Sequence, residues 1–243
     1  MGKNKLKRFE ELKSYPNVLQ PNVEELLMGK MLVGISSSRD NIVYRNENRD
    51  RHKCYAWGDI FGNTNRIVLE LGCGKGEYVV NLARMNRDIN YIGIDIKGAR
   101  IWKGATIALN EGLRNVLFVR TYVEMLPYIF REGDVSEIWI TFPEPEPKKE
   151  RKRFTHKRYL NMYRRILCKE NKIHLKTDSE EFYLFTLDML NEGGCMLHYK
   201  VEDIYNEKNA SILEEIKELQ IRTFYEDKWL LENRKIYYIC FSV

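Results

Sequence analysis

Short apolar runs alternate with helical patterns along the chain from Arg66 onward. Runs rich in β-branched residues predict buried strands, and apolar residues spaced three or four apart predict helices. The predicted strands are RIVLEL (66–71), NYIGID (90–95), NVLFVR (115–120), EIWITF (137–142) and NKIHLKT (171–177). Because helical segments separate them, the pattern predicts an α/β fold with a doubly wound, mostly parallel sheet and helices on both faces.

The two ends of the chain depart from this alternation. Residues 1–60 show no regular period, and we interpret them as an N-terminal arm with one short helix near Val23–Met28. Residues 61–243 are predicted to form the main domain. At its end, HYKVEDIY (198–205) and KIYYICFSV (235–243) are two further strand-like runs around a helical segment, which makes a seven-stranded sheet the expectation.

The composition is typical of a globular protein. The 243 residues are 44% hydrophobic and 31% charged, which suffices for a sizeable core. No apolar run approaches the roughly 20 residues of a membrane helix, and the N-terminus lacks the apolar segment of a secretory signal. The five cysteines form no C-x-x-C pair, so no metal site or disulfide framework is predicted, and a cytoplasmic location is expected.

Positive charge is concentrated between Lys148 and Arg158. This segment has seven basic residues and one acid, a net charge of +6, whereas the whole chain has a net charge of +5. Such a patch favours a polyanion, either nucleic acid or an anionic membrane. The alternative is a solvated basic loop with no partner.

A glycine-rich sequence, ELGCGKG from Glu70 to Gly76, follows a predicted strand and opens a predicted helix. Dinucleotide-binding turns have the wider spacing G-x-G-x-x-G, and a carboxylate at Glu70 would repel a pyrophosphate. That carboxylate suits S-adenosylmethionine, which has a positive amino group and a sulfonium and no phosphate. A second acid, Asp95, ends the next strand, where it can accept from both ribose hydroxyls. The glycines alone would fit a plain turn, but with both acids they predict a nucleoside cofactor.

The segment TFPEPEPKKERKRFTHKR begins at Thr141, where another predicted strand ends. Open α/β sheets bind ligands at the carboxyl ends of their strands, so Glu144 is expected beside the cofactor. Asp178 follows the next strand, and it is either a partner of Glu144 in one pocket or only a cap of the next helix. A carboxylate beside a phosphate-binding strip suits methylation of a base within a nucleic acid.

These residues resemble the Rossmann-like S-adenosylmethionine-dependent methyltransferases, whose sheet commonly ends in an antiparallel hairpin. The chain is most similar to the tRNA (guanine-N7)-methyltransferases, which carry F-P-D-P-W-x-K-[KAR]-R-H-x-K-R-R, T-D-x-E and T-x-[FY]-E motifs. In the same order this chain has FPEPEPKKERKRFTHKR, TDSEE (177–181) and TFYE (223–226). NVLQPN (17–22) and FGNTNRIVLELGCGKGEY (61–78) are also similar, so the resemblance covers nearly the whole chain.

The resemblance implies transfer of a methyl group from S-adenosylmethionine to N7 of guanine 46 in the variable loop of tRNA, by a monomer or homodimer. It implies catalytic roles for Glu144 and Asp178. The cofactor residues are then Glu70, Gly72, Gly74, Gly76, Asp95, Thr121, Tyr122 and Glu144. The substrate residues are Lys148, Asp178, Thr223 and Glu226, to which the basic strip adds Lys149, Arg151, Lys152 and Arg153.

Three places depart from the family pattern. Glu144 replaces an aspartate, Glu146 replaces a tryptophan, and Thr121 and Tyr122 stand where the family has an acid or amide near the adenine. We expect Tyr122 to stack on the adenine instead. Two alternatives stay open: a methyltransferase for another RNA, DNA or a protein amine, and a non-catalytic RNA-binding module of the same fold.

Overall fold

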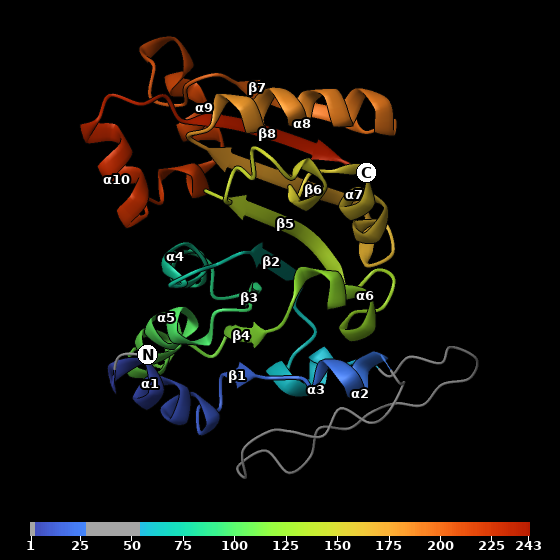
Figure 1. The fold of residues 1–243 in the computed structure, drawn as a ribbon, viewed down its shortest axis with the longest axis vertical. Coiled ribbons are helices and arrows are strands. Elements are labelled where there is room, and N and C mark those ends of the chain that lie inside the picture. The colour runs from blue at the N-terminus through green and yellow to red at the C-terminus, as the bar shows by residue number, and fades with distance from the viewer. Residues whose placement is uncertain (1–2, 28–53) are drawn as a thin grey trace.

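One sheet of eight strands organises residues 3–27 and 54–243, the part of the chain that the computed structural model describes (Figure 1). The strand order is β1-β4-β3-β2-β5-β6-β8-β7. The strands are β1 (Val18–Leu19), β2 (Ile67–Leu71), β3 (Asn90–Asp95), β4 (Val116–Arg120), β5 (Val135–Thr141), β6 (Leu167–Thr177), β7 (Met196–Val201) and β8 (Tyr237–Ser242).

The pairing of the strands confirms the predicted fold class. Strands β1 to β6 pair in parallel, and β8 runs antiparallel to both β6 and β7. The sheet has eight strands rather than the predicted seven, because Val18 and Leu19 pair with Phe118 and Val119 at its edge. A strand of two residues is too short for a period to reveal it.

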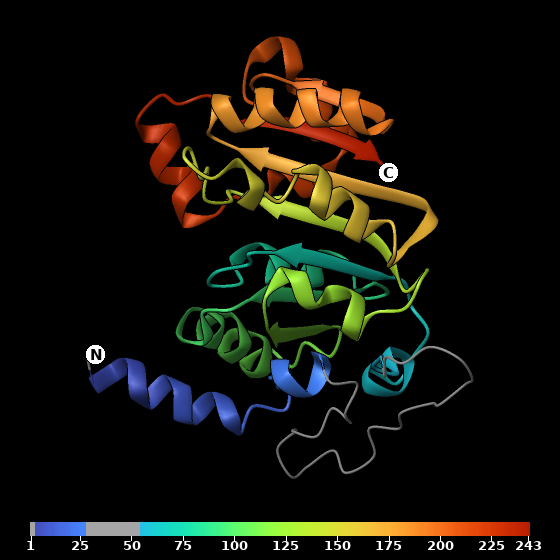
Figure 2. The same ribbon diagram turned by 45° about the vertical axis from the view of Figure 1, so that its right-hand side comes forward.

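Helices cover both faces of the sheet, as Figures 1 and 2 show. The α-helices are α1 (Lys3–Lys13), α2 (Val23–Leu27), α3 (Trp57–Phe61), α4 (Glu77–Met85), α5 (Gly98–Asn110), α6 (Leu126–Ile129), α7 (Lys157–Tyr163), α8 (Glu180–Gly193), α9 (Ala210–Glu215) and α10 (Phe224–Leu231). The 3-10 helices are η1 (Val123–Met125), η2 (Glu150–Lys152), η3 (Glu207–Asn209) and η4 (Lys217–Gln220).

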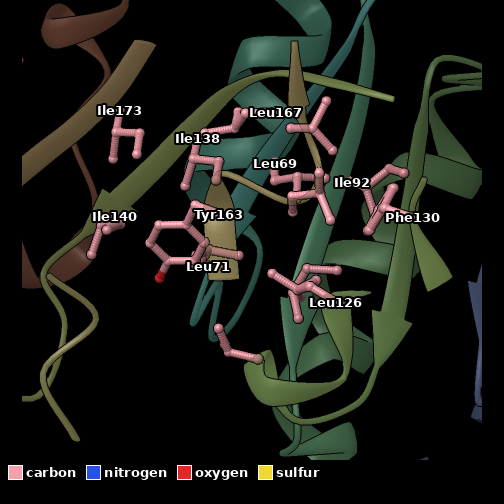
Figure 3. Close-up of a cluster of buried hydrophobic side chains, with 14 of the residues drawn as sticks. Leu69, Leu71, Ile92, Leu126, Phe130, Ile138, Ile140, Tyr163, Leu167 and Ile173 are labelled. Atoms are coloured by element: carbon pink, nitrogen blue, oxygen red, sulfur yellow. The ribbon is translucent and has the colours of Figure 1, made fainter. Parts of the chain in front are cut away.

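Two apolar layers form the core, one on each face of the sheet. Leu69 and Leu71 of β2 face the layer that holds α6, α7 and α8, and Val68 faces the layer that holds α4 and α5. Figure 3 shows Leu69, Ile138 and Tyr163 in the first of these layers. Because both faces are buried, the parallel strands are apolar at successive positions instead of alternating.

The first described part of the N-terminal arm, residues 3–27, packs onto the main domain. The carboxylate of Glu11 accepts from the indole N–H of Trp102 at 2.7 Å, and the hydroxyls of Tyr15 and Thr106 lie 2.9 Å apart. These contacts dock α1, which the sequence pattern did not predict, on α5. The predicted helix near Val23–Met28 is found as α2, and Met28 lies outside the described residues. A domain boundary at residue 60 stays a prediction.

Candidate functional site

The carboxyl ends of the five central parallel strands meet at one edge of the sheet. In Figure 1 the arrowheads of β5 and β6 point toward this edge, where α10 lies. The chain leaves it at Gly72 after β2, Asp95 at the end of β3, Thr121 after β4, Phe142 after β5 and Asp178 after β6. The predicted site residues therefore come to the same edge.

The glycine loop between β2 and α4 has a left-handed backbone at each of its three glycines. The φ angles of Gly72, Gly74 and Gly76 are 69°, 56° and 71°, values that disfavour any side chain. A Cβ at Gly76 would also lie 2.7 Å from the Phe118 ring. At Gly74 the nearest atom to a Cβ would be a backbone oxygen at 3.8 Å. Gly76 is thus required for packing, and the loop is open at Gly74.

Asp95 fixes the glycine loop and keeps hydrogen-bonding capacity for a ligand. One carboxylate oxygen accepts from the backbone N–H of Gly74 at 2.9 Å, and the other accepts from that of Lys97 at 2.7 Å. Each oxygen has further lone pairs. Nearby, the hydroxyl of Thr121 is buried and has no hydrogen-bond partner among the described residues. An unpaired hydroxyl and a half-exposed carboxylate fit a nucleoside such as that of S-adenosylmethionine.

Glu70 lies buried at the end of β2, just before the glycine loop. Its side chain is 2% exposed, and its two oxygens accept from the backbone N–H of Val79 at 2.9 Å and from the hydroxyl of Thr141 at 2.7 Å. Glu70 therefore ties α4 and β5 together beneath the glycine loop. Its contact with the amino group of the cofactor stays a prediction. The sequence pattern could not distinguish a supporting acid from a lining one.

The buried carboxyl of Glu70 makes stability depend on pH. Burial raises its pKa from the ordinary 4.5 to about 8, although the hydrogen bonds from Thr141 and Val79 act to lower it. The folded protein then keeps a proton that the unfolded chain has released. The stabilising contribution of protonated Glu70 is complete below pH 4.5 and is lost as the pH rises to about 8.

We expect Glu70→Gln to weaken the loss of stability with rising pH. The melting temperature of the wild type should fall more between about pH 5.5 and pH 8 than that of the variant, because the amide does not ionise. Thermal denaturation at both pH values measures the difference. Glu132→Gln, at an exposed position, is the matched control and should keep the wild-type decline. An equal fall in all three proteins would contradict the assignment.

Glu144 lies beside the end of β3. Its carboxylate is 3.2 Å from the ammonium of Lys97, the residue whose backbone N–H binds Asp95. The loop after β5 therefore reaches across the end of β2 toward the nucleoside site. The Glu144 side chain is 72% exposed, so this ion pair contributes little stability.

Arg153 was predicted to contact phosphate, but the structure buries its side chain. Its side chain is 1% exposed, its Nε donates to the carbonyl oxygen of Pro145 at 2.9 Å, and its guanidinium binds Glu181 and lies 4.5 Å from the ring centre of Phe185. Arg153 thus fastens the loop that carries Glu144 to α8. The segment of basic residues gave no sign that one member turns inward.

Asp178 is not the cap of the following helix. The hydroxyl of Ser179 accepts a hydrogen bond from the backbone N–H of Phe182 and caps α8. The Asp178 carboxylate instead forms an ion pair with the guanidinium of Arg234, at a distance of 3.1 Å. Glu144 and Asp178 lie at the same sheet edge, but each pairs with a different cation. The structure does not bring the two carboxylates into contact.

The segment TFYE begins α10 and was predicted to contact the substrate. Thr223 and Glu226 form a capping box, and Glu226 is fully buried with its carboxylate 2.6 Å from the ammonium of Lys176. Glu226 is therefore a buried ion-pair partner, and its contact with the substrate stays a prediction. The exposed residues of this segment are Phe224 and Tyr225, which were not among the predicted site residues, although two adjacent aromatics within this motif were a visible signal.

The basic strip remains exposed apart from Arg153. Lys148, Lys149, Arg151 and Lys152 all lie at the surface, and within the described residues none of the four forms an ion pair. They follow Glu144 in the same loop and end at η2. Their charges are thus available to bind an anion such as phosphate.

A cavity lies elsewhere on the sheet. It has a volume of about 690 Å³ and is lined by residues that include Arg66, Glu137 and Lys169, at the amino ends of the parallel strands. Ligands of open α/β sheets bind at the carboxyl ends, so we do not assign the site to this cavity. In the part of the chain that the structure describes, no cluster of metal-ligating side chains occurs, and no helix is long and apolar enough to cross a membrane.

Comparisons with known proteins show which family the chain resembles. A model of a family described as putative methyltransferases matches residues 64–239. The tRNA (guanine-N(7)-)-methyltransferase of Christiangramia forsetii is 45% identical over 245 residues, which cover 100% of this chain and 99% of the relative. The protein of the same name from Bacteroides fragilis is 42% identical, over 99% of this chain and 86% of the relative.

Solved structures share the fold. An antibiotic-related methyltransferase aligns with a TM-score of 0.54 at 20% identity, over 77% of this chain and 92% of its own. The 16S rRNA methyltransferase KamB aligns with a TM-score of 0.55 at 16% identity, over 74% of this chain and 88% of its own. At these identities the likeness concerns the fold alone.

Proposed function

Because the chain belongs to the tRNA (guanine-N(7)-)-methyltransferase family, we propose that it methylates N7 of a guanine in tRNA, with S-adenosylmethionine as the methyl donor. The observation that carries this function is the bridge made by Lys97 between Asp95 and Glu144. Through it a nucleoside site, a carboxylate and a basic strip share one sheet edge. The expected position is guanine 46 of the variable loop.

The reaction needs positioning and charge more than proton transfer. S-adenosylmethionine supplies a methyl group on a positively charged sulfur. Guanine N7 has a lone pair and no proton, so no side chain has to act as a strong base. Methylation leaves the purine positively charged, and the carboxylates of Glu144 and Asp178 stabilise that charge as it develops. A carboxylate also accepts from the N1–H or the exocyclic amine of guanine, which selects the base.

Cofactor recognition follows from the loop geometry. Asp95 accepts from the ribose hydroxyls, the open backbone at Gly74 admits the methionine part, and Thr121 and Tyr122 lie where the adenine is expected. Tyr122 is 52% exposed, which leaves its ring available for stacking. Glu70 and Gly76 support the loop from within.

The exposed cations bind the tRNA backbone. Replacing Lys148, Lys149, Arg151 and Lys152 together by glutamine should lower tRNA affinity and reduce the slope of log affinity against log salt by roughly 3, because fewer counterions are released. Filter binding at several salt concentrations measures the slope. The matched control replaces Lys169 and Lys172, exposed at the amino end of β6, and should leave it unchanged. An unaltered slope in the fourfold variant would mean that these four residues do not contact the tRNA.

The direct test is methylation of unmodified tRNA with labelled S-adenosylmethionine, followed by nucleoside analysis. We expect the label in 7-methylguanosine and at one position. Label in another nucleoside, another RNA or a protein amine would favour the alternative substrates, and absence of cofactor binding in calorimetry would favour a non-catalytic RNA-binding module. We further propose a cytoplasmic enzyme that acts as a monomer or homodimer without metal.

A further inference from the structure

Two aromatic side chains are exposed beside the glycine loop. Phe224 is 59% exposed and Tyr225 is 46% exposed. The ammonium of Lys75, which lies within the glycine loop, is 4.9 Å from the ring centre of Phe224 and 5.8 Å from that of Tyr225. The backbone N–H of Phe224 donates to the carboxylate of Glu77 at 3.0 Å. These contacts hold the first residues of α10 against the glycine loop.

The helix that carries the two rings is anchored from below. Thr223 caps it through the backbone N–H of Glu226, and Glu226 pairs with Lys176 of β6, both side chains being fully buried. The hydroxyl of Tyr205 adds a hydrogen bond to Glu226 at 2.7 Å. Phe224 and Tyr225 are therefore presented on a fixed support, which lowers the entropy lost when a ligand stacks on them.

A row of rings connects the glycine loop to Asp178. The ring centres of Tyr225 and Trp229 are 6.5 Å apart with planes inclined by 25°. Arg234 lies 4.0 Å from the Trp229 ring and pairs with Asp178. Figures 1 and 2 both show α10 at the carboxyl ends of β5 and β6. The exposed rings thus lie between the glycine loop and Asp178, a carboxylate proposed to act in methyl transfer.

We propose that Phe224, assisted by Tyr225, is a stacking surface for the guanine that is methylated. This inference rests on the proposed function. A flat purine stacks on an exposed ring, and the face of Phe224 already attracts a cation, the ammonium of Lys75. N7 methylation makes the purine cationic, so attraction to the ring is stronger for the methylated base than for neutral guanine. An interaction that strengthens along the reaction raises kcat rather than only lowering KM.

The test compares Phe224→Leu and Phe224→Tyr with the wild type on unmodified tRNA. Leucine keeps an apolar side chain and removes the π face, and tyrosine restores it. We expect Phe224→Leu to lower kcat/KM for tRNA roughly 5- to 100-fold, mainly through kcat, and Phe224→Tyr to stay within about threefold of the wild type. Leu231→Ala, at an 86% exposed position at the end of the same helix, is the control and should keep full activity.

Binding gives a second measurement that does not depend on turnover. The wild type should bind tRNA methylated at the target guanine more tightly than unmethylated tRNA, and Phe224→Leu should lose this preference while its melting temperature and cofactor affinity stay unchanged. An active wild type with an equally active Phe224→Leu variant would overturn the stacking role and leave the proposed function standing. A wild type that does not methylate guanine N7 would overturn both.

Discussion

Replacing Lys176 by methionine is expected to destabilise the protein by about 3–5 kcal/mol, because it leaves the buried carboxylate of Glu226 without its cation. The ammonium of Lys176 also donates to the backbone carbonyls of Leu219 and Ile221 at 2.9 and 3.0 Å. One side chain therefore holds β6, η4 and the start of α10 together. Burial lowers the pKa of Lys176, and the nearby Glu226 carboxylate opposes this shift.

Urea denaturation of the wild type and the variant measures this loss. The matched comparison is the double variant Lys176→Met with Glu226→Gln, which removes the unpaired charge and keeps a hydrogen-bond acceptor for the helix cap. It should be more stable than Lys176→Met alone. A single variant that loses less than about 1 kcal/mol, or a double variant less stable than the single one, would mean that the pair does not act as described.

Removing either proposed catalytic carboxylate is expected to slow methyl transfer about 100-fold. Glu144→Gln and Asp178→Asn keep the shape of the side chain but remove the negative charge that stabilises the developing purinium. Single-turnover methylation of tRNA with saturating cofactor measures the chemical step. Because Asp178 pairs with Arg234, its variant is also tested for an unchanged melting temperature.

Glu146→Gln is the control for these two variants. Glu146 lies in the same loop, has no assigned contact with the base, and should keep nearly the wild-type rate. If Glu144→Gln and Asp178→Asn both stay within about threefold of the wild type, charge stabilisation by these residues is excluded, and positioning alone would have to explain catalysis.

The positions of the candidate site residues were predictable wherever strand ends decide them. Gly74, Asp95 and Glu144 follow apolar runs, and parallel strands bring such residues to one edge whatever the rest of the chain does. The tight turn predicted from the glycine spacing is also found, because the positive φ at these glycines is a requirement of the local backbone.

Roles that depend on burial were not predictable in the same way. Arg153 is one cation among several in the sequence, yet it turns inward because Glu181 and Phe185 of α8 lie beside it. Glu226 belongs to a motif that suggested substrate contact, but its partner Lys176 is fifty residues earlier in the chain. Which charge is buried depends on such distant neighbours.

The sequence alone determined the fold class, the strands that deliver the site residues and the family to which the chain belongs, since periodicity and motif spacing are local properties. The tertiary structure alone decided that Glu70, Arg153 and Glu226 support the site from within and that Phe224 and Tyr225 border it. The reason is that burial and pairing arise between segments far apart in the chain, which no local pattern encodes.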